Sequence, residues 1–69
     1  MRKYEKLWDY LKNNCITTET LTFDEIRRIS GSDVDDSFIQ YSKDLSMYGL
    51  SVVRVDLRSR TVMFTRNGR

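Results

Sequence analysis

The sequence has no histidine, no proline and only one cysteine, Cys15, among its 69 residues. Without histidine it lacks the commonest general base of enzymes, and a thiol without a histidine partner lacks the usual activating base. One cysteine also argues against a zinc site and a disulfide framework. We therefore expect a protein that is not an enzyme and binds no cofactor. Cys15 is interpreted as a spare thiol in a polar loop.

Long apolar runs are also missing, since no stretch approaches the roughly 20 residues of a membrane span. Residues 1–5 (MRKYE) lack the apolar segment of a signal peptide, and a lone cysteine is typical of a reducing compartment. These features predict a cytoplasmic protein made of one domain, residues 1–69. A domain this small is marginally stable alone, so we expect its eight aromatic residues to supply a compact core.

The first half of the chain contains two predicted helices. Apolar residues at i, i+3, i+4 and i+7 from Tyr4 predict an amphipathic helix over 3–13. Residues 14–20 are polar and predict a loop, followed by a short extended segment at 21–23. Thr22 and Glu25 form a capping-box pattern that predicts a helix over 23–30, ended by Gly31.

The second half contains a predicted third helix and a β-hairpin. Phe38, Tyr41, Leu45 and Tyr48 are spaced as the buried stripe of a helix over 36–48, capped by Asp35 or Asp36 and ended by Gly49. From Leu50 onward apolar residues recur at every second position, as in a β-strand. One buried face is expected to carry Val53, Val55, Leu57, Val62 and Phe64, and the tip of the hairpin is basic. Residues 66–69 are expected to fray.

This order of elements predicts an α+β fold, a small winged helix-turn-helix-like domain in which the C-terminal hairpin is the wing. Residues 21–23 are expected to add a third strand to the hairpin. The alternative is a generic α+β miniprotein with the same order of elements.

Residues 4–12 (YEKLWDYLK), 21–26 (LTFDEI) and 36–38 (DSF) resemble a family of short uncharacterised bacterial and phage proteins. Proteins of that group open with a tyrosine-rich helix and end in a β-hairpin. Larger relatives carry tryptophans in the third helix, where this chain has Tyr41 and Tyr48. The resemblance implies the winged-helix-like fold and a gene carried by phages or mobile elements. It implies no activity.

Charge is unevenly spread and gives the main functional signal. Residues 51–69 carry five arginines and one aspartate, although the net charge of the chain is only +2. Arginines on a wing suit phosphate contacts, so DNA or another nucleic acid is the leading predicted partner. The predicted nucleic-acid-binding residues lie on the second and third helices and on the hairpin: Arg27, Arg28, Ser37, Gln40, Lys43, Arg54, Arg58, Arg60 and Arg66. Arg54 and Arg66 are expected to lie near one another on its outer face.

An acidic segment opposes this interpretation and suggests alternatives. Asp33, Asp35 and Asp36 lie at the entrance to the third predicted helix, where they would repel a DNA backbone. Their spacing lacks the glycine and terminal glutamate of a calcium loop, so turn chemistry explains them better than a metal site. The first alternative is an inhibitor of a host defence protein, of the anti-CRISPR kind, that binds through Asp33, Asp35, Asp36, Asp44 and Met47. The second is a homodimer in contact through Met47, Met63 and Val52.

Overall fold

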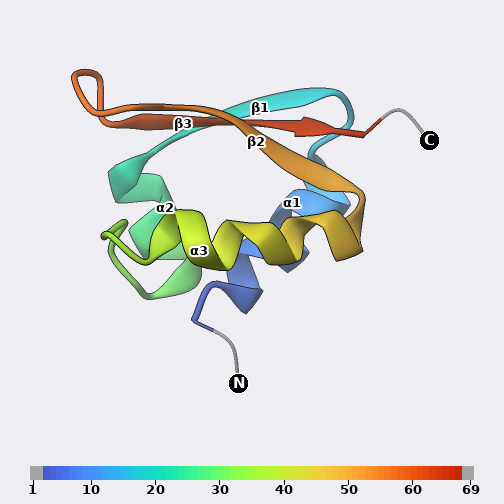
Figure 1. Cartoon of the computed structure of the whole chain (residues 1–69), viewed down its shortest axis with the longest axis horizontal. Coiled ribbons are helices and arrows are strands. Elements are labelled where there is room, and N and C mark those ends of the chain that lie inside the picture. Colours follow the sequence, from blue (N-terminus) through green and yellow to red (C-terminus); the bar gives the residue numbers. More distant parts are fainter. Residues whose placement is uncertain (1–2, 68–69) are drawn as a thin grey trace.

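A computed structural model describes residues 3–67. Within them the chain forms an α+β fold with three α-helices, one 3-10 helix and a three-stranded antiparallel sheet of order β1-β3-β2. The elements are α1 (Glu5–Asn14), β1 (Thr18–Thr22), α2 (Phe23–Ser30), α3 (Phe38–Ser42), η1 (Lys43–Tyr48), β2 (Leu50–Asp56) and β3 (Thr61–Arg66). The sheet forms one layer and the helices lie together on one of its faces (Figure 1).

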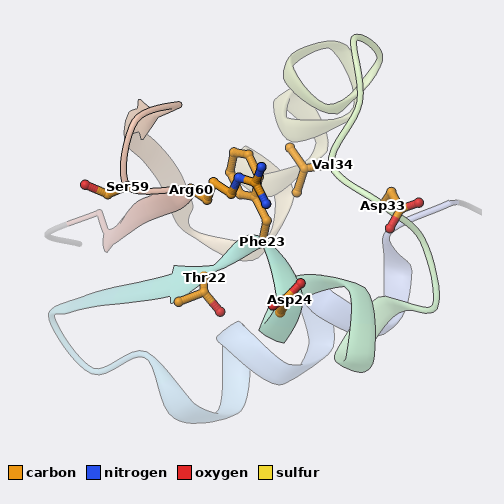
Figure 2. A pocket seen from close by; sticks show the side chains of 7 residues that line it. All are labelled: Thr22, Phe23, Asp24, Asp33, Val34, Ser59 and Arg60. Atoms are coloured by element: carbon orange, nitrogen blue, oxygen red, sulfur yellow. The ribbon is translucent and has the colours of Figure 1, made fainter.

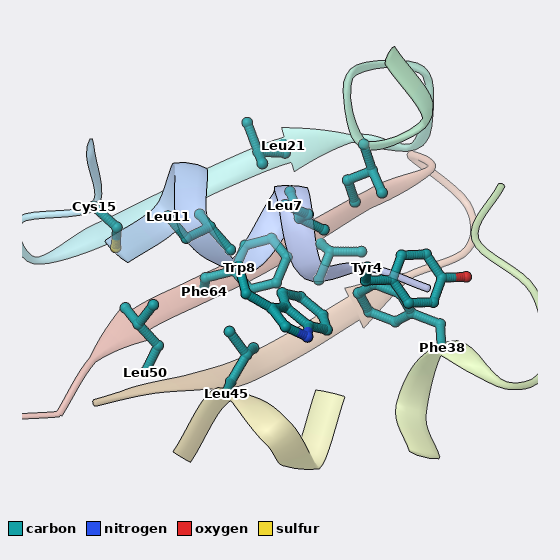
Figure 3. Packing of buried hydrophobic residues seen from close by; sticks show 12 residues of the cluster. Tyr4, Leu7, Trp8, Leu11, Cys15, Leu21, Phe38, Leu45, Leu50 and Phe64 are labelled. Atoms are coloured by element: carbon teal, nitrogen blue, oxygen red, sulfur yellow. The ribbon is translucent and has the colours of Figure 1, made fainter. Parts of the chain in front are cut away.

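The core fills the space between these two layers (Figure 3). Trp8 and Tyr4 of the first helical segment pack against Phe38, with ring centroids 5.1–6.0 Å apart. Phe64 of β3 reaches the same cluster from the sheet. The predicted aromatic core is thus confirmed for these four side chains, and burying each one contributes on the order of 2–3 kcal/mol.

The predicted start of α2 is confirmed in detail. The amide of Glu25 donates to the Thr22 hydroxyl over 3.1 Å, and the amide of Thr22 donates to the Glu25 carboxylate over 2.8 Å. This reciprocal pair satisfies two amides that a helix N-terminus leaves free. Gly31 ends the helix at φ 79°, a left-handed conformation that glycine adopts without strain.

The third predicted helix is correct in place but wrong in form. Instead of one α-helix over 36–48, the structure has five residues of α3 followed by 3-10 winding in η1. Ser42 and Ser46 donate their hydroxyls to the carbonyls of Ile39 and Lys43, three residues earlier. Such side-chain bonds compete with the α-helical pattern and suit tighter winding. The predicted cap at Asp35 or Asp36 is wrong, because Ser37 is the N-cap of α3 and no side chain caps this helix. The Asp35 carboxylate accepts from the Ser37 amide in the turn before it.

The predicted loop at 14–20 is wrong at its end, because Thr18, Glu19 and Thr20 already belong to β1. These residues pair with β3 in register, so β1 is the predicted third strand and is longer than expected. The polar side chains of these residues gave no strand pattern in the sequence, because an edge strand with one exposed face needs few apolar residues.

The predicted buried face of the hairpin is wrong for half of β2. The register shifts between Val52 and Arg54, so Val53 is unpaired and 55% exposed. This β-bulge reverses the side-chain alternation. Val52, which was expected on the surface, packs against the core, as Val55 does after the bulge.

Cys15 also differs from expectation. It lies in the connection after α1, yet its side chain is buried in the core cluster. Burial raises the pKa of the Cys15 thiol, because the thiolate is poorly solvated there. The thiol therefore acts as a small apolar core residue.

Candidate functional site

The tip of the β2–β3 hairpin is a four-residue turn organised by Asp56. The Asp56 carboxylate accepts from the amides of Arg58 and Ser59 over 3.0 and 3.1 Å. These hydrogen bonds, that of Ser59 first, lower the pKa of Asp56, because they stabilise its charged form. Arg60 closes the turn with φ 56°, the one left-handed non-glycine residue in the described part of the chain.

Arg60 is anchored to the start of α2. Its carbonyl accepts from the Phe23 amide over 2.8 Å, which ties the hairpin to the helix layer. An open hollow of about 550 Å³ lies at this junction. Figure 2 shows Arg60 and Phe23 at its centre. Its lining comes from β1, α2, the α2–α3 connection and the hairpin: Thr22, Phe23, Asp24, Asp33, Val34, Ser59 and Arg60.

A second, more apolar hollow of about 380 Å³ continues from the first, since Phe23 and Val34 line both. The remaining lining residues come from the start of α3 and the end of β2: Asp35, Asp36, Phe38, Ile39, Val55 and Leu57. We call the two hollows together the hairpin-end cleft. Leu57 is 77% exposed and Ile39 is 53% exposed at its two sides. The helix layer and the sheet thus leave a hollow with apolar lining at this end.

Three of the predicted arginines lie on the exposed part of the hairpin. Arg58 and Arg60 are exposed at the tip, and neither forms a salt bridge with a residue of 3–67. Arg54 is exposed on β2, with its guanidinium 3.8 Å from the Asp56 carboxylate. An exposed pair at that distance is weak, so the hairpin presents a largely uncompensated positive charge.

Arg66 does not join this group, which corrects the expectation that it lies beside Arg54. Arg54 pairs with Met63, whereas Arg66 pairs with Leu50, three residues further along β3. The Arg66 guanidinium donates to the carbonyls of Lys12 and Cys15 over 2.7 and 2.8 Å. A cation at the C-terminus of a helix stabilises its free carbonyls, so Arg66 has a structural role.

The C-terminal strand also continues further than expected. The Arg66 amide donates to the Thr17 carbonyl and the Asn67 amide to the Gly49 carbonyl, both over 2.8 Å. Fraying was predicted from residue 66, and these bonds show that it does not begin there. Residues 68–69 lie outside the described part of the chain.

The predicted residues on the helices are spread over several places. The Arg27 guanidinium lies 3.8 Å from the Asp33 carboxylate, and Arg28 lines a shallow hollow together with Tyr10 of α1. The Ser37 hydroxyl donates to Asp35 over 2.6 Å and is engaged there. Gln40, Lys43 and Met47 are exposed on α3 and η1, while Asp44 is half-buried.

The acidic segment is partly neutralised within the fold. The Asp35 carboxylate accepts from the Lys3 ammonium over 2.6 Å and from the Ser37 amide over 3.0 Å. The hydrogen bond from Lys3 is the largest cause of the lowered pKa of Asp35, and the same bond raises the pKa of Lys3. Asp33 faces Arg27. Of the three aspartates, Asp36 alone is exposed without a salt bridge to residues 3–67.

Sequence reasoning missed the apolar part of the site. The sequence pattern places Leu57 on the buried face of the hairpin and assigns Phe23 and Val34 to no site. The one available signal was the strongly apolar Leu57 directly beside the basic tip. Its exposure arises because Leu57 lies in the turn after the end of β2, outside the strand.

Residues 3–67 contain no group of three or more side chains suited to hold a metal ion. No helix within the same residues is long and apolar enough to cross a membrane. Comparison with protein-family models, characterised proteins and solved structures gave no match, so the function must be inferred from the site itself.

Proposed function

We propose that this chain is a winged-helix-like module that binds nucleic acid through its β2–β3 hairpin, without chemistry. The order α1-β1-α2-α3-β2-β3 and the antiparallel sheet support this proposal. In it, the hairpin is the wing that contacts phosphates, and Gln40 and Lys43 on α3 and η1 face the bases or the backbone. The seven residues between α2 and α3 form a longer connection than the usual three or four of a helix-turn-helix.

The observation that carries the proposal is Arg60 in a left-handed conformation at an exposed turn. A non-glycine residue there costs about 1 kcal/mol relative to glycine. Strained residues of this kind cluster at functional sites. The Phe23–Arg60 hydrogen bond holds Arg60 in the lining of the hairpin-end cleft, two residues after Arg58. Two arginines in a fixed turn suit phosphate contacts better than two on a mobile tail.

The acidic segment opposes this function less than its sequence suggests. Asp35 is paired with Lys3, and Asp33 faces Arg27, so repulsion of a phosphate backbone is reduced at both positions. Asp36 carries the main uncompensated negative charge of the three. Arg54, Arg58 and Arg60 outnumber it on the neighbouring hairpin, and phosphate attraction is therefore expected to prevail there.

The test is binding of a labelled 20-base-pair DNA duplex, and of its single strands, at 50–200 mM salt. The variant Arg58→Ala/Arg60→Ala is expected to bind at least tenfold more weakly and to lower the slope of log affinity against log salt by about two. The matched control is Lys6→Ala/Lys12→Ala, which removes two exposed charges from α1.

The control variant has the same net charge as the hairpin variant and is expected to stay within about threefold of the unmodified protein. Equal weakening of the two variants would show attraction by net charge alone, and the hairpin would then not be the site. No binding to duplex or single strands at 50 mM salt would refute a nucleic-acid function.

A protein partner is the second candidate, because exposed Leu57 and Ile39 flank an apolar hollow. In this proposal a host defence protein occupies the hairpin-end cleft. Since Asp35 supports the fold, Asp36→Lys is the informative substitution among the acidic residues. A host protein that is captured by the unmodified chain and lost with Asp36→Lys would favour this function. Capture unchanged by Asp36→Lys would count against it.

A further inference from the structure

We propose that the hairpin-end cleft is a self-association site whose occupant is the hairpin tip of a second copy of this chain. This inference goes beyond nucleic-acid binding and can be tested in its absence. It combines three features of the same end of the molecule: an apolar hollow, opposite charges on its two sides, and an exposed leucine next to an arginine.

The apolar hollow of the cleft favours an apolar side chain as its occupant. Phe23, Phe38 and Val55 line it, and all three also pack against or belong to the core. Leu57 and Ile39 extend from its sides into solvent, which is an unfavourable position for large apolar groups. An occupant that covers both side chains would remove this exposed surface from water.

The charged residues of the hollow favour an occupant that carries a basic residue next to its apolar side chain. The only charged residues that line the apolar hollow, within residues 3–67, are Asp35 and Asp36. Asp35 is paired with Lys3, which leaves Asp36 available. The fitting occupant is therefore a leucine-like side chain followed by a basic residue.

The chain itself carries such a pair, an exposed leucine followed by an arginine, beside the hollow. Leu57 is followed by Arg58 in the exposed turn, and no residue of 3–67 forms a salt bridge with Arg58. In a two-fold dimer each contact occurs twice. The hairpin side of one copy then faces the helix side of the other, so that Arg58 meets Asp36 of the second copy in both halves. Leu57 and Ile39 of the two copies meet between these charges.

The size of this end makes the dimer weak. The molecule measures 30 × 28 × 19 Å, and the hairpin tip lies at one end of its longest axis (Figure 1). One copy can bury roughly 500 Å² there, which is at the low end for specific interfaces. We therefore expect a transient dimer that becomes detectable as the protein concentration rises toward about 1 mM.

Sedimentation velocity from 10 µM to 1 mM, without nucleic acid, measures the association. We expect concentration-dependent dimerisation that weakens at least tenfold in Asp36→Arg and in Arg58→Asp, since each places like charges in contact. An equimolar mixture of these two variants is the decisive sample. In a mixed dimer both contacts between positions 36 and 58 join opposite charges, one as in the unmodified protein and one with the two signs exchanged. Association of the mixture therefore returns to within about threefold of the unmodified protein.

The matched controls are Asp9→Arg and Lys12→Asp, which reverse exposed charges on α1 and leave dimerisation unchanged. Circular dichroism checks that every variant is folded. Three results would each overturn the proposal: a monomer at 1 mM, unchanged association of both charge-reversed variants, or a mixture that associates no better than its components.

Discussion

The two ends of the molecule use an arginine in opposite ways. At the end where β3 meets α1, the Arg66 guanidinium donates to two carbonyls of the helix terminus, and Cys15 and Leu50 are buried beside it. At the hairpin end, Arg60 is exposed, and its backbone instead of its side chain holds the layers together. The first end is closed by side-chain packing and hydrogen bonds, and the second is open around Leu57.

This difference suggests that one end of the sheet mainly stabilises the fold and that the hairpin end carries the proposed function. The closed end also exposes an apolar side chain, Ile16, but its arginine is engaged at the helix terminus. The hairpin end keeps exposed charge, exposed apolar surface and a strained residue, each of which lowers the stability of a small domain. These features suit contact with another molecule.

The largest expected effect comes from a comparison of two leucines, one at each end of the molecule. Leu11→Ala removes a fully buried side chain near the closed end and is expected to lower the free energy of unfolding by about 2–5 kcal/mol. Leu57→Ala removes an exposed one and should change it by no more than about 0.5 kcal/mol. Urea unfolding followed by circular dichroism measures both. Similar losses would show that the hairpin end is packed as tightly as the closed end.

Arg66→Ala is expected to have the next largest effect on the free energy of unfolding. It leaves the carbonyls of Lys12 and Cys15 without their guanidinium donors, which is expected to cost about 1–3 kcal/mol. Arg58→Ala, also an arginine of the hairpin strands and their turn, serves as the control and should change the unfolding energy by less than about 0.5 kcal/mol. If the two variants unfold alike, Arg66 is a surface residue after all.

Arg60→Gly should have a smaller effect of the opposite sign. Glycine relieves the left-handed backbone at φ 56°, and we expect a gain of about 0.5–1 kcal/mol in unfolding energy. Nucleic-acid binding should fall at the same time. Arg60→Ala removes the same charge but keeps the strain, so it should weaken binding without the gain in stability. A loss of stability in the glycine variant would contradict the role assigned to this residue.

The smallest expected effect is a pH dependence at Asp35. Its pKa is lower in the folded state than in the unfolded chain, mainly through the Lys3 hydrogen bond. The charged form therefore adds stability at neutral pH, and this contribution is lost as the pH falls through the usual carboxyl range. Asp35→Asn should be less stable than the unmodified protein at pH 7, and the difference should shrink from about pH 5 toward pH 2. A difference that is constant with pH would rule out this titration.

Local signals predicted most of the fold. The periodicity around Trp8, the capping box at Thr22 and the turn glycines at 31 and 49 each depend on neighbouring residues, and each element appears where it was expected. Half of the candidate site was also predictable, because Arg58 and Arg60 lie in a turn whose position follows from the two strands. The cleft was not predictable, since its lining comes from segments distant in sequence.

The sequence by itself determined the first two helices, the capping box at Thr22, the basic turn and the absence of histidine, because these depend on residue type and short-range spacing. The tertiary structure decided what the spacing left open. The pairing of β2 with β3 placed a bulge at Val53, the turn after β2 left Leu57 exposed, and the pairing of β3 with β1 brought Arg66 to the end of α1. Long-range contacts choose between alternatives that are locally equivalent, so the same residue type at 60 and 66 became exposed at one end of the sheet and structural at the other.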